Sequence, residues 1–385
     1  MNARTPMKTL MPFLFLLATA WSVVANASAS AETAPLTTAE GFAVPQRGYR
    51  FSFPRDHGSH PEFKLEWWYI TGHLFAEDGR RFGYQATFFR SAAPDKRGQL
   101  FLAHMALLDV RGGKFFHQER LNREGWDAVA SVETLDVRNG PWLLRFAERT
   151  GDRGDGAGKN RAAEGMELRG GVRGEVAFAL TLEPEKPLVI FGEDGVSRKG
   201  AEATAASYYL TFPRLKTAGT LTLGEETMNV NGQSWMDHEI SSSQLGAGQV
   251  GWDWVSVQLN DGREIMFYRL RGSDGSSDAA STLTWIAADG RLTKRDFGWE
   301  VLDTWKSAET GGVYPSRVRL TTSDPVSGKG VAFTLEPLAK AQELTGNLGG
   351  IPYWEGACRV LADDGREVGR AFMELTGYAK VLKLQ

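Results

Sequence analysis

The sequence predicts an all-β protein built from antiparallel hairpins. Three observations support this fold class: recurrent Asp-Gly turn signals, many large aromatic residues among many glycines, and a scarcity of capped helical segments. The chain contains 12 Trp, 21 Phe and 44 Gly, and large rings with glycine turns are typical of β-sheets around an apolar interior. Long stretches with a 3.6-residue period are hard to find after residue 31, so we expect at most short helices.

The first 31 residues have the features of a cleavable signal peptide. Arg4 and Lys8 form a basic region, residues 10–20 are apolar, and residues 25–31 are small and offer several Ala-x-Ala cleavage sites. The apolar part falls short of the roughly 20 residues that span a bilayer, which argues against a membrane anchor. We therefore expect a periplasmic or secreted protein whose mature chain begins between residues 28 and 32, with no stable membrane anchor after cleavage.

Four turn signals share the spelling Asp-Gly-Arg, at residues 78–80, 261–263, 289–291 and 364–366. Each lies between runs of β-branched, aromatic and aliphatic residues. Because Asp and Gly tolerate a positive φ, each pair fits a two-residue type I′ turn. The sequence therefore predicts four antiparallel hairpins with turns of this type.

Two of these hairpins share one order of features. Residues 66–90 and residues 251–271 each run from an aromatic strand through an Asp-Gly turn to a strand that ends in Arg. This order predicts a β unit present twice, each copy opening a domain, although chance similarity is the alternative, since aromatic period-2 patterns are common in strands. The roughly 350 mature residues also exceed one ordinary core. We expect two domains, 42–240 and 250–385, joined near the Ser/Gly-rich stretch 241–251.

The remaining composition excludes several classes of function. The formal net charge is -3 and no polybasic segment follows the signal peptide, so the chain lacks the electrostatic footprint of a nucleic-acid-binding protein. Cys358 is the single cysteine and lies far from the cleavage region. It therefore supports neither an N-terminal lipid anchor nor an intramolecular disulfide, and we expect a small buried apolar side chain.

Residues 235–239 form the most unusual polar cluster, Trp-Met-Asp-His-Glu. In an extended strand Trp235, Asp237 and Glu239 share one face, which places two carboxylates about 7 Å apart beside an indole. A carboxyl group in an apolar pocket has its pKa raised and can donate a proton. The alternative is a rim of solvated charges at a domain junction.

Two further acids fall on the more apolar face of aromatic strands, Glu66 and Asp253. A buried carboxylate is costly unless it is hydrogen-bonded or functional. Two interpretations are therefore open: a role in a site, or pairing with an arginine such as Arg90 or Arg271. The aromatic and acidic cluster at 353–356 is open in the same way.

The histidines predict no metal site. The His-Glu pair at 238–239 begins an HExxH zinc signature, but the next residues supply no second histidine. His57 and His60 are three residues apart with Glu62 nearby, in a Pro/Gly/Ser-rich stretch typical of an exposed loop. A catalytic zinc needs a third ligand and an ordered scaffold. We predict neither a metal nor a cofactor.

Five motifs, taken together in chain order, resemble one family. EWWYITG at 66–72, WMDHE at 235–239, GWDW at 251–254, YWEG at 353–356 and ELTGY at 374–378 are similar to the secreted AttH-like branch of the carotenoid 1,2-hydratase (CrtC) family. The resemblance implies two lipocalin-like antiparallel β-barrel domains. AttH-like members are often linked to ABC-transporter permeases, whereas the hydratases add water to a terminal double bond of an acyclic carotenoid without a cofactor.

The resemblance leads to two expected functions. The first is a periplasmic protein that binds a long apolar ligand, a lipid or isoprenoid, and serves an envelope ABC-transporter system. The second is a hydro-lyase in which a carboxylic acid protonates the alkene and aromatic faces stabilise the carbocation. A carrier needs a continuous apolar cavity with few perturbed acids, and a hydratase needs a desolvated carboxyl group beside an aromatic wall. A structural envelope protein with filled barrels is a third alternative.

The predicted site residues form two groups. The candidate catalytic acids are Asp237, Asp253 and Glu239. The expected ligand-binding residues are Glu66, Trp67, Trp68, Tyr69, Trp235, His238, Trp252, Trp254, Tyr353, Trp354 and Glu355. Because ATP and NAD(P)H are scarce outside the cytoplasm, chemistry at such a site would be cofactor-free.

Overall fold

The computed structural model describes residues 1–2, 34–93, 97–125, 127–147, 165–346, 348 and 351–382. The predicted signal peptide, 1–31, lies outside this part of the chain except for its first two residues. Within the described ranges the helical structure consists of one short 3-10 helix, η1 (Arg55–His57). No described helix has the length and apolar character needed to cross a bilayer.

The first sheet contains thirteen of the described strands. They are β1 (Leu65–Ala76), β2 (Arg81–Ala92), β3 (Gln99–Asp109), β4 (Lys114–Arg123), β5 (Ala128–Ala130), β6 (Asp136–Asn139), β7 (Trp142–Phe146), β8 (Met166–Val172), β9 (Val176–Pro184), β10 (Val189–Phe191), β11 (Ser197–Arg198), β12 (Ala206–Leu223) and β13 (Glu226–Ser243). Their order is β4-β3-β2-β1-β13-β12-β9-β8-β7-β6-β5, and β10 and β11 also pair with β12. The first and last strands, β1 and β13, are therefore neighbours.

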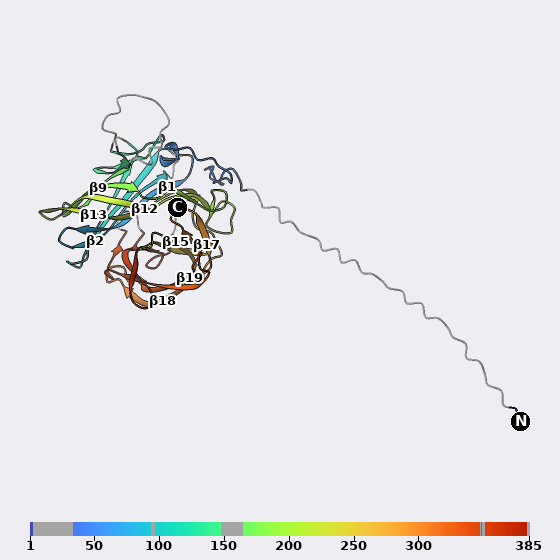
Figure 1. Ribbon diagram of the computed structural model, residues 1–385. Helices are drawn as coiled ribbons and strands as arrows, with labels where there is room; N and C mark the ends of the chain where they lie inside the picture. Colours follow the sequence, from blue (N-terminus) through green and yellow to red (C-terminus); the bar gives the residue numbers. More distant parts are fainter. Residues whose placement is uncertain are drawn as a thin grey trace. The chain divides into compact units, whose positions relative to one another are not determined.

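The second sheet contains ten described strands. They are β14 (Gln249–Leu259), β15 (Glu264–Gly272), β16 (Thr282–Ile286), β17 (Leu292–Arg295), β18 (Phe297–Lys306), β19 (Val313–Ser323), β20 (Gly330–Pro337), β21 (Glu343–Leu344), β22 (Tyr353–Leu361) and β23 (Glu367–Thr376). Their order is β17-β16-β15-β14-β23-β22-β20-β19-β18, with β21 beside β22. All pairings are antiparallel and both sheets curl (Figure 1), which confirms the predicted all-β, lipocalin-like fold class.

The two hairpins with a shared order of features occupy equivalent places. The hairpin β1–β2 opens the first sheet and β14–β15 opens the second, and each opening strand pairs with the last strand of its sheet. Both sheets belong to one compact unit, residues 34–385. The division into domains at 42–240 and 250–385 stays a prediction.

The four Asp-Gly-Arg segments form hairpin turns, but not of the predicted type. Each glycine has a φ between 79° and 84°, whereas the aspartates do not, because Arg173 and Asp194 are the only described residues with a side chain at positive φ. In the first turn Gly79 N–H donates to Ala76, and the Asp78 carboxylate accepts the backbone N–H of Arg80 at 3.0 Å. The other three turns repeat these bonds. The loops therefore have three residues and a glycine bulge, and the aspartate side chain favours this form over type I′.

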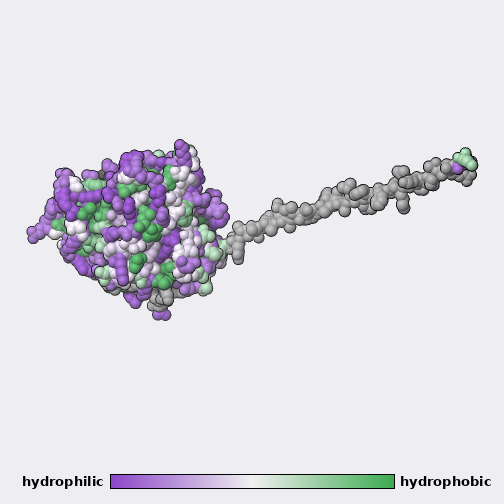
Figure 2. All heavy atoms as spheres, turned by 90° about the horizontal axis from the view of Figure 1, so that it is seen from below, coloured by the Kyte–Doolittle hydropathy of each residue, from purple (hydrophilic) through white to green (hydrophobic). Residues whose placement is uncertain are grey.

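Apolar side chains form a core within each sheet and a third cluster between the sheets. Trp68, Ile70 and Leu74 point into the first core, as the predicted strand alternation requires. Cys358 is fully buried in the second core, which confirms its expected role as a small apolar side chain. The third cluster joins residues of both sheets, among them Tyr209 and Trp254. On the face shown in Figure 2, polar residues predominate and apolar residues are scattered among them.

Two contacts outside the cavity contribute to the packing of the sheets. Gly83 on β2 lies directly against Ala357 on β22. Glu264 on β15 is fully buried and forms two salt bridges. One is with Lys186, which precedes β10, and the other is with Arg214 of β12 at 2.6 Å. A buried carboxylate with two cationic partners is compensated only while both sheets stay in place.

We predict that Gly83→Ala lowers the free energy of unfolding by about 1–3 kcal/mol, because overpacking forces the sheets apart. A Cβ at this position would lie 2.4 Å from the Ala357 Cβ. Urea unfolding of the variant measures the loss. Gly330→Ala is the control, since nothing lies within 4 Å of the added carbon. Equal stability of Gly83→Ala and the wild type would contradict the packing described.

Candidate functional site

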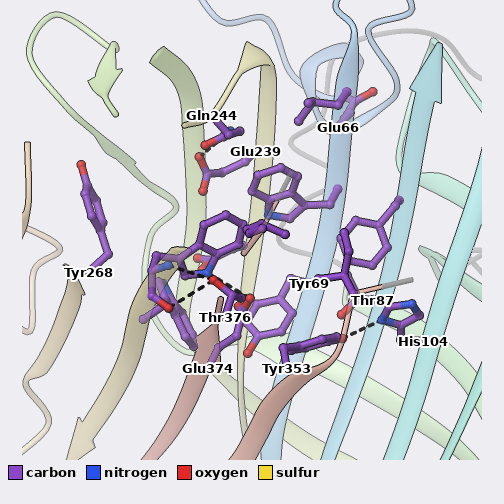
Figure 3. Close-up of a pocket in the computed structure, with 18 of the residues that line it drawn as sticks. Glu66, Tyr69, Thr87, His104, Glu239, Gln244, Tyr268, Tyr353, Glu374 and Thr376 are labelled. Carbon is purple, nitrogen blue, oxygen red and sulfur yellow. Dashed lines mark hydrogen bonds between the residues drawn. The ribbon is translucent and has the colours of Figure 1, made fainter. Parts of the chain in front are cut away.

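A cavity of about 440 Å³ lies between the two sheets (Figure 3). This volume is within the range of about 300–1,000 Å³ typical of small-molecule sites. Its wall comes from β1, β2, β3, β12 and β13 of the first sheet and from β14, β15, β22 and β23 of the second. The aromatic residues of the wall are Trp67, Tyr69, Phe89, Tyr209, Trp252, Trp254, Tyr268 and Tyr353.

Asp237 lies on this wall, buried and surrounded by neutral hydrogen-bond donors. Its Oδ1 accepts the Thr211 hydroxyl and the Trp235 indole N–H, the latter at 2.7 Å. Its Oδ2 accepts the Tyr209 hydroxyl at 2.7 Å, and that hydroxyl accepts the Trp254 indole N–H at 2.8 Å. Burial raises the pKa of Asp237 to about 7, although these hydrogen bonds act in the opposite direction.

Glu374 is a second carboxyl group on the wall. It projects from β23, and its Oε1 accepts the Trp252 indole N–H at 3.0 Å. Burial raises the pKa of Glu374 to about 8 against this hydrogen bond, and the nearby charges of Glu239 and Asp237 add to the rise. Sequence analysis placed this residue only in a family motif. The signal that singled out Glu66 and Asp253 does not apply to Glu374, because Met373 and Leu375 point to the opposite face of β23 and Glu374 shares its face with Arg370 and Thr376.

Glu355 lies behind the wall, opposite Glu374 on the neighbouring strand β22. It is fully buried, its Oε1 accepts the Tyr69 hydroxyl, and its Oε2 has no hydrogen-bond partner among the described residues. Burial keeps the pKa of Glu355 well above its usual range, and the charge of Glu374 adds to this effect. Burial therefore favours the neutral form of Glu355.

Two further polar groups line the cavity. Glu239 pairs with Lys199 at 3.0 Å, and the Lys199 ammonium lies 4.6 Å from the ring centre of Tyr209. His104 contacts the Tyr353 hydroxyl through Nδ1 at 2.6 Å. Burial lowers the pKa of His104 to about 4, so the imidazole is neutral at physiological pH.

Glu66 is the centre of a buried network at one edge of the cavity. Its Oε1 accepts from His60 Nδ1 at 2.9 Å and His238 Nε2 at 2.8 Å, and its Oε2 accepts from Ser59 and from Arg90 at 3.1 Å. Burial opposes ionisation, but these hydrogen bonds and the Arg90 charge hold the pKa of Glu66 well below its usual range. His60, Glu66 and His238 offer possible metal-binding atoms within 4.8 Å of one another. Protein hydrogen bonds already occupy both carboxylate oxygens.

The expectation that His57 and His60 lie in an exposed loop is wrong. Both side chains are buried, and only Glu62 of that group is exposed. His60 is held between Asp56, at 3.2 Å, and Glu66. The network on Glu66 therefore pulls the loop inward, an effect that the polar sequence of the loop does not reveal.

Asp253 lies outside the cavity lining. It projects from the face of β14 opposite to Trp252 and Trp254 and pairs with Arg269 and Arg271, each at 2.8 Å. The Tyr378 hydroxyl adds a third contact at 2.9 Å. Both acids therefore pair with the arginines considered for them, Glu66 with Arg90 and Asp253 with Arg271.

The structure brings together eight of the fourteen predicted site residues. Those in the cavity wall are Glu66, Trp67, Tyr69, Asp237, Glu239, Trp252, Trp254 and Tyr353. Those outside it are Trp68, Trp235, His238, Asp253, Trp354 and Glu355. Trp68 and His238 stack on each other at 4.8 Å, and the Trp354 indole donates to the Lys340 carbonyl. Wall residues absent from the sequence prediction include His104, Lys199, Tyr209, Tyr268 and Glu374.

Comparisons with known proteins identify related chains. The family model described as AttH-like matches residues 44–378. A crystal structure of a protein assigned as AttH from Nitrosomonas europaea is 34% identical, with a TM-score of 0.74, and the match covers 86% of this chain and 98% of that one. Kievitone hydratase from Nectria haematococca matches at 14% identity and a TM-score of 0.63, covering 90% and 98%. The crystal structure of CghA with Sch210972 matches at 14% identity with a TM-score of 0.51, and the match covers 89% of this chain and 98% of that one. No curated protein matches the chain.

We predict that burial of Asp237 makes stability fall as pH rises from about 4 to about 7. Its pKa rises from 3.8 in the unfolded chain to about 7 in the folded protein, so the folded state binds more protons in this window. Asp237→Asn removes this dependence, which amounts to at most about 4 kcal/mol. The variant therefore gains stability relative to the wild type as pH rises.

Urea unfolding at several pH values measures this effect. Asp289→Asn, at an exposed hairpin turn, is the control and should follow the wild-type curve. A constant difference between Asp237→Asn and the wild type across the window would show that Asp237 is not protonated in the folded state.

Proposed function

The chain belongs to the AttH-like family, and from this premise we propose that it is a cofactor-free hydratase acting on a double bond of an isoprenoid or polyene. The observation that carries the proposal is the presence of Asp237 and Glu374, two carboxyl groups with pKa values of about 7 and about 8, in one aromatic cavity. A general acid works best when its pKa lies near the working pH. Both groups meet this condition.

The aromatic wall suits the intermediate of such a reaction. Protonation of a trisubstituted alkene gives a tertiary carbocation, which the faces of Trp and Tyr rings attract. Trp254 meets Trp235 edge to face at 6.1 Å and Tyr69 at 5.1 Å, so these rings hold one another in fixed orientations. Fixed rings around the reacting carbon stabilise developing charge without reorganising.

The choice between carrier and hydratase rests on the acids. A carrier of apolar molecules has no need for carboxyl groups at neutral pH in its cavity, and each buried polar group weakens the binding of a hydrocarbon. Kievitone hydratase has a similar fold, which supports the proposal by analogy at the level of the fold alone.

Carriage of a lipid or isoprenoid for an envelope ABC-transporter system is the second candidate function. Much of the cavity wall is apolar, including Leu65, Leu102, Leu270 and Leu382, which favours an apolar ligand. We further propose export to the periplasm on the segment 1–31. Protein recovered from the periplasm should begin between residues 28 and 32 by N-terminal sequencing. Mass spectrometry should find a co-purifying apolar ligand if carriage is the function, and its absence would count against carriage.

We predict that Asp237→Asn lowers hydration of isoprenoid alkenes by about 10²- to 10⁴-fold, because it removes an acid–base group. Wild type and variant are incubated with geraniol, farnesol, geranylgeraniol and lycopene in ¹⁸O-labelled water. Mass spectrometry then detects the labelled tertiary alcohol.

Asp253→Asn is the matched control for this experiment, since Asp253 is equally buried but lies outside the cavity wall. Circular dichroism establishes that both variants fold. Turnover by Asp237→Asn equal to the wild type would rule out a role for this carboxyl group in the reaction.

A further inference from the structure

We infer that the two cavity carboxyl groups have different roles: Glu374 donates the proton to the alkene, and Asp237 is the base that accepts a proton from the attacking water. This assignment rests on the proposed hydratase function. It follows from the hydrogen bonds that each carboxyl group accepts and from the charged and polar groups that surround it in the cavity.

The partners of Asp237 favour its ionised form. Three groups donate to it, and the Trp235 indole is a donor that cannot accept in return. The Tyr209 hydroxyl is itself engaged by Trp254 as an acceptor, so its proton points to Asp237. A proton on Asp237 would compete with these donors for the lone pairs of the carboxyl oxygens. The arrangement therefore suits Asp237 to the role of proton acceptor.

The surroundings of Glu374 favour its neutral form. Among the described residues Trp252 is its one hydrogen-bond donor, and no cationic side chain pairs with it. Its side chain is half-buried and lies on the cavity wall, where Figure 3 shows it near Thr376. The proton of a neutral Glu374 therefore faces the space in which a ligand would lie.

The acidic groups around Glu374 act in the same direction, and the Lys199 ammonium, which also lines the cavity, is paired with Glu239. Glu355 and Tyr353 lie on the adjacent strand β22, and Asp237 and Glu239 lie on β13. Each of these is an acid, so ionisation of Glu374 would add a negative charge to an acidic surrounding. Burial and the charges of Glu239 and Asp237 raise the pKa of Glu374 to about 8, so Glu374 holds a proton near neutral pH.

The reaction balances with these two groups and water. The O–H bond of Glu374 breaks as a C–H bond forms at the less substituted alkene carbon, which leaves a tertiary cation and the Glu374 carboxylate. A water oxygen bonds to the cation, and its proton passes to the Asp237 carboxylate. That proton then returns to Glu374 through solvent, in the direction of the higher pKa. Alkene and water are consumed, and a tertiary alcohol is formed.

Infrared difference spectroscopy tests the assignment without a substrate. Between about pH 6 and about pH 9, the wild type should lose the carbonyl bands of two carboxylic acids, near pH 7 and pH 8. Glu374→Gln should remove the upper transition and Asp237→Asn the lower one. Glu367→Gln, an exposed position on the same strand as Glu374, should leave both. The assignment is overturned if Asp237→Asn removes the upper transition, or if Glu374→Gln leaves both.

Turnover provides a second measurement. On any alkene that the wild type hydrates, Glu374→Gln should lower the rate by at least about 100-fold, and Glu374→Asp should restore part of it. Unchanged turnover in Glu374→Gln would overturn the assignment of Glu374 as the donor. Failure of the wild type to hydrate any alkene would instead contradict the proposed function, and the infrared transitions would then decide the protonation assignment alone.

Discussion

The hydrogen bond from the Trp254 indole to the Tyr209 hydroxyl is the contact on which the site depends. It crosses from β14 of the second sheet to β12 of the first at 2.8 Å, and it orients the hydroxyl that donates to Asp237. Tyr69 reaches Glu355 across the same junction, and His104 reaches Tyr353. The polar groups that line the cavity are therefore also the groups that hold the sheets together. The position of the sheets and the protonation of the site cannot change independently.

Glu66 differs from the two cavity acids Asp237 and Glu374 in its partners and in the direction of its pKa shift. Glu66 has Arg90 and two histidines as partners and remains ionised, as suits a group that fixes a loop against a strand. Asp237 and Glu374 receive hydrogen bonds from neutral donors alone, so burial dominates and their pKa values rise toward neutrality. Cationic partners do not always outweigh burial, because the pKa of Asp253 is raised by burial although Arg269 and Arg271 pair with it.

Much of the fold could be predicted from local sequence patterns, since strand alternation and turn residues depend on near neighbours. The alternation of Trp68, Ile70 and Leu74 and the four hairpins follow from such patterns. The type I′ turn was a wrong prediction because the hydrogen bond that the arginine N–H donates to the aspartate carboxylate cannot be seen in the Asp-Gly pair alone. The cluster at 235–239 was visible as a local pattern, whereas Tyr209 and Lys199 reach it only through tertiary packing. Glu374 did not meet the criterion applied to Glu66, because it shares its face of the strand with Arg370 and Thr376.

The junction between the sheets would be more stable without its acids. Apolar residues of similar shape often stabilise a protein relative to buried polar groups, which must be matched by partners on both sides. Here the matching is incomplete, since one oxygen of the fully buried Glu355 has no partner among the described residues, and Glu374 has a single donor. Sites where a chain departs from the rules of stable packing are commonly sites of function. These departures lie on two neighbouring strands, β22 and β23, which also contribute Tyr353, Glu374 and Thr376 to the cavity wall. The proposed hydratase function requires exchangeable protons in the cavity, and this requirement would account for acids at a junction that apolar side chains could otherwise fill.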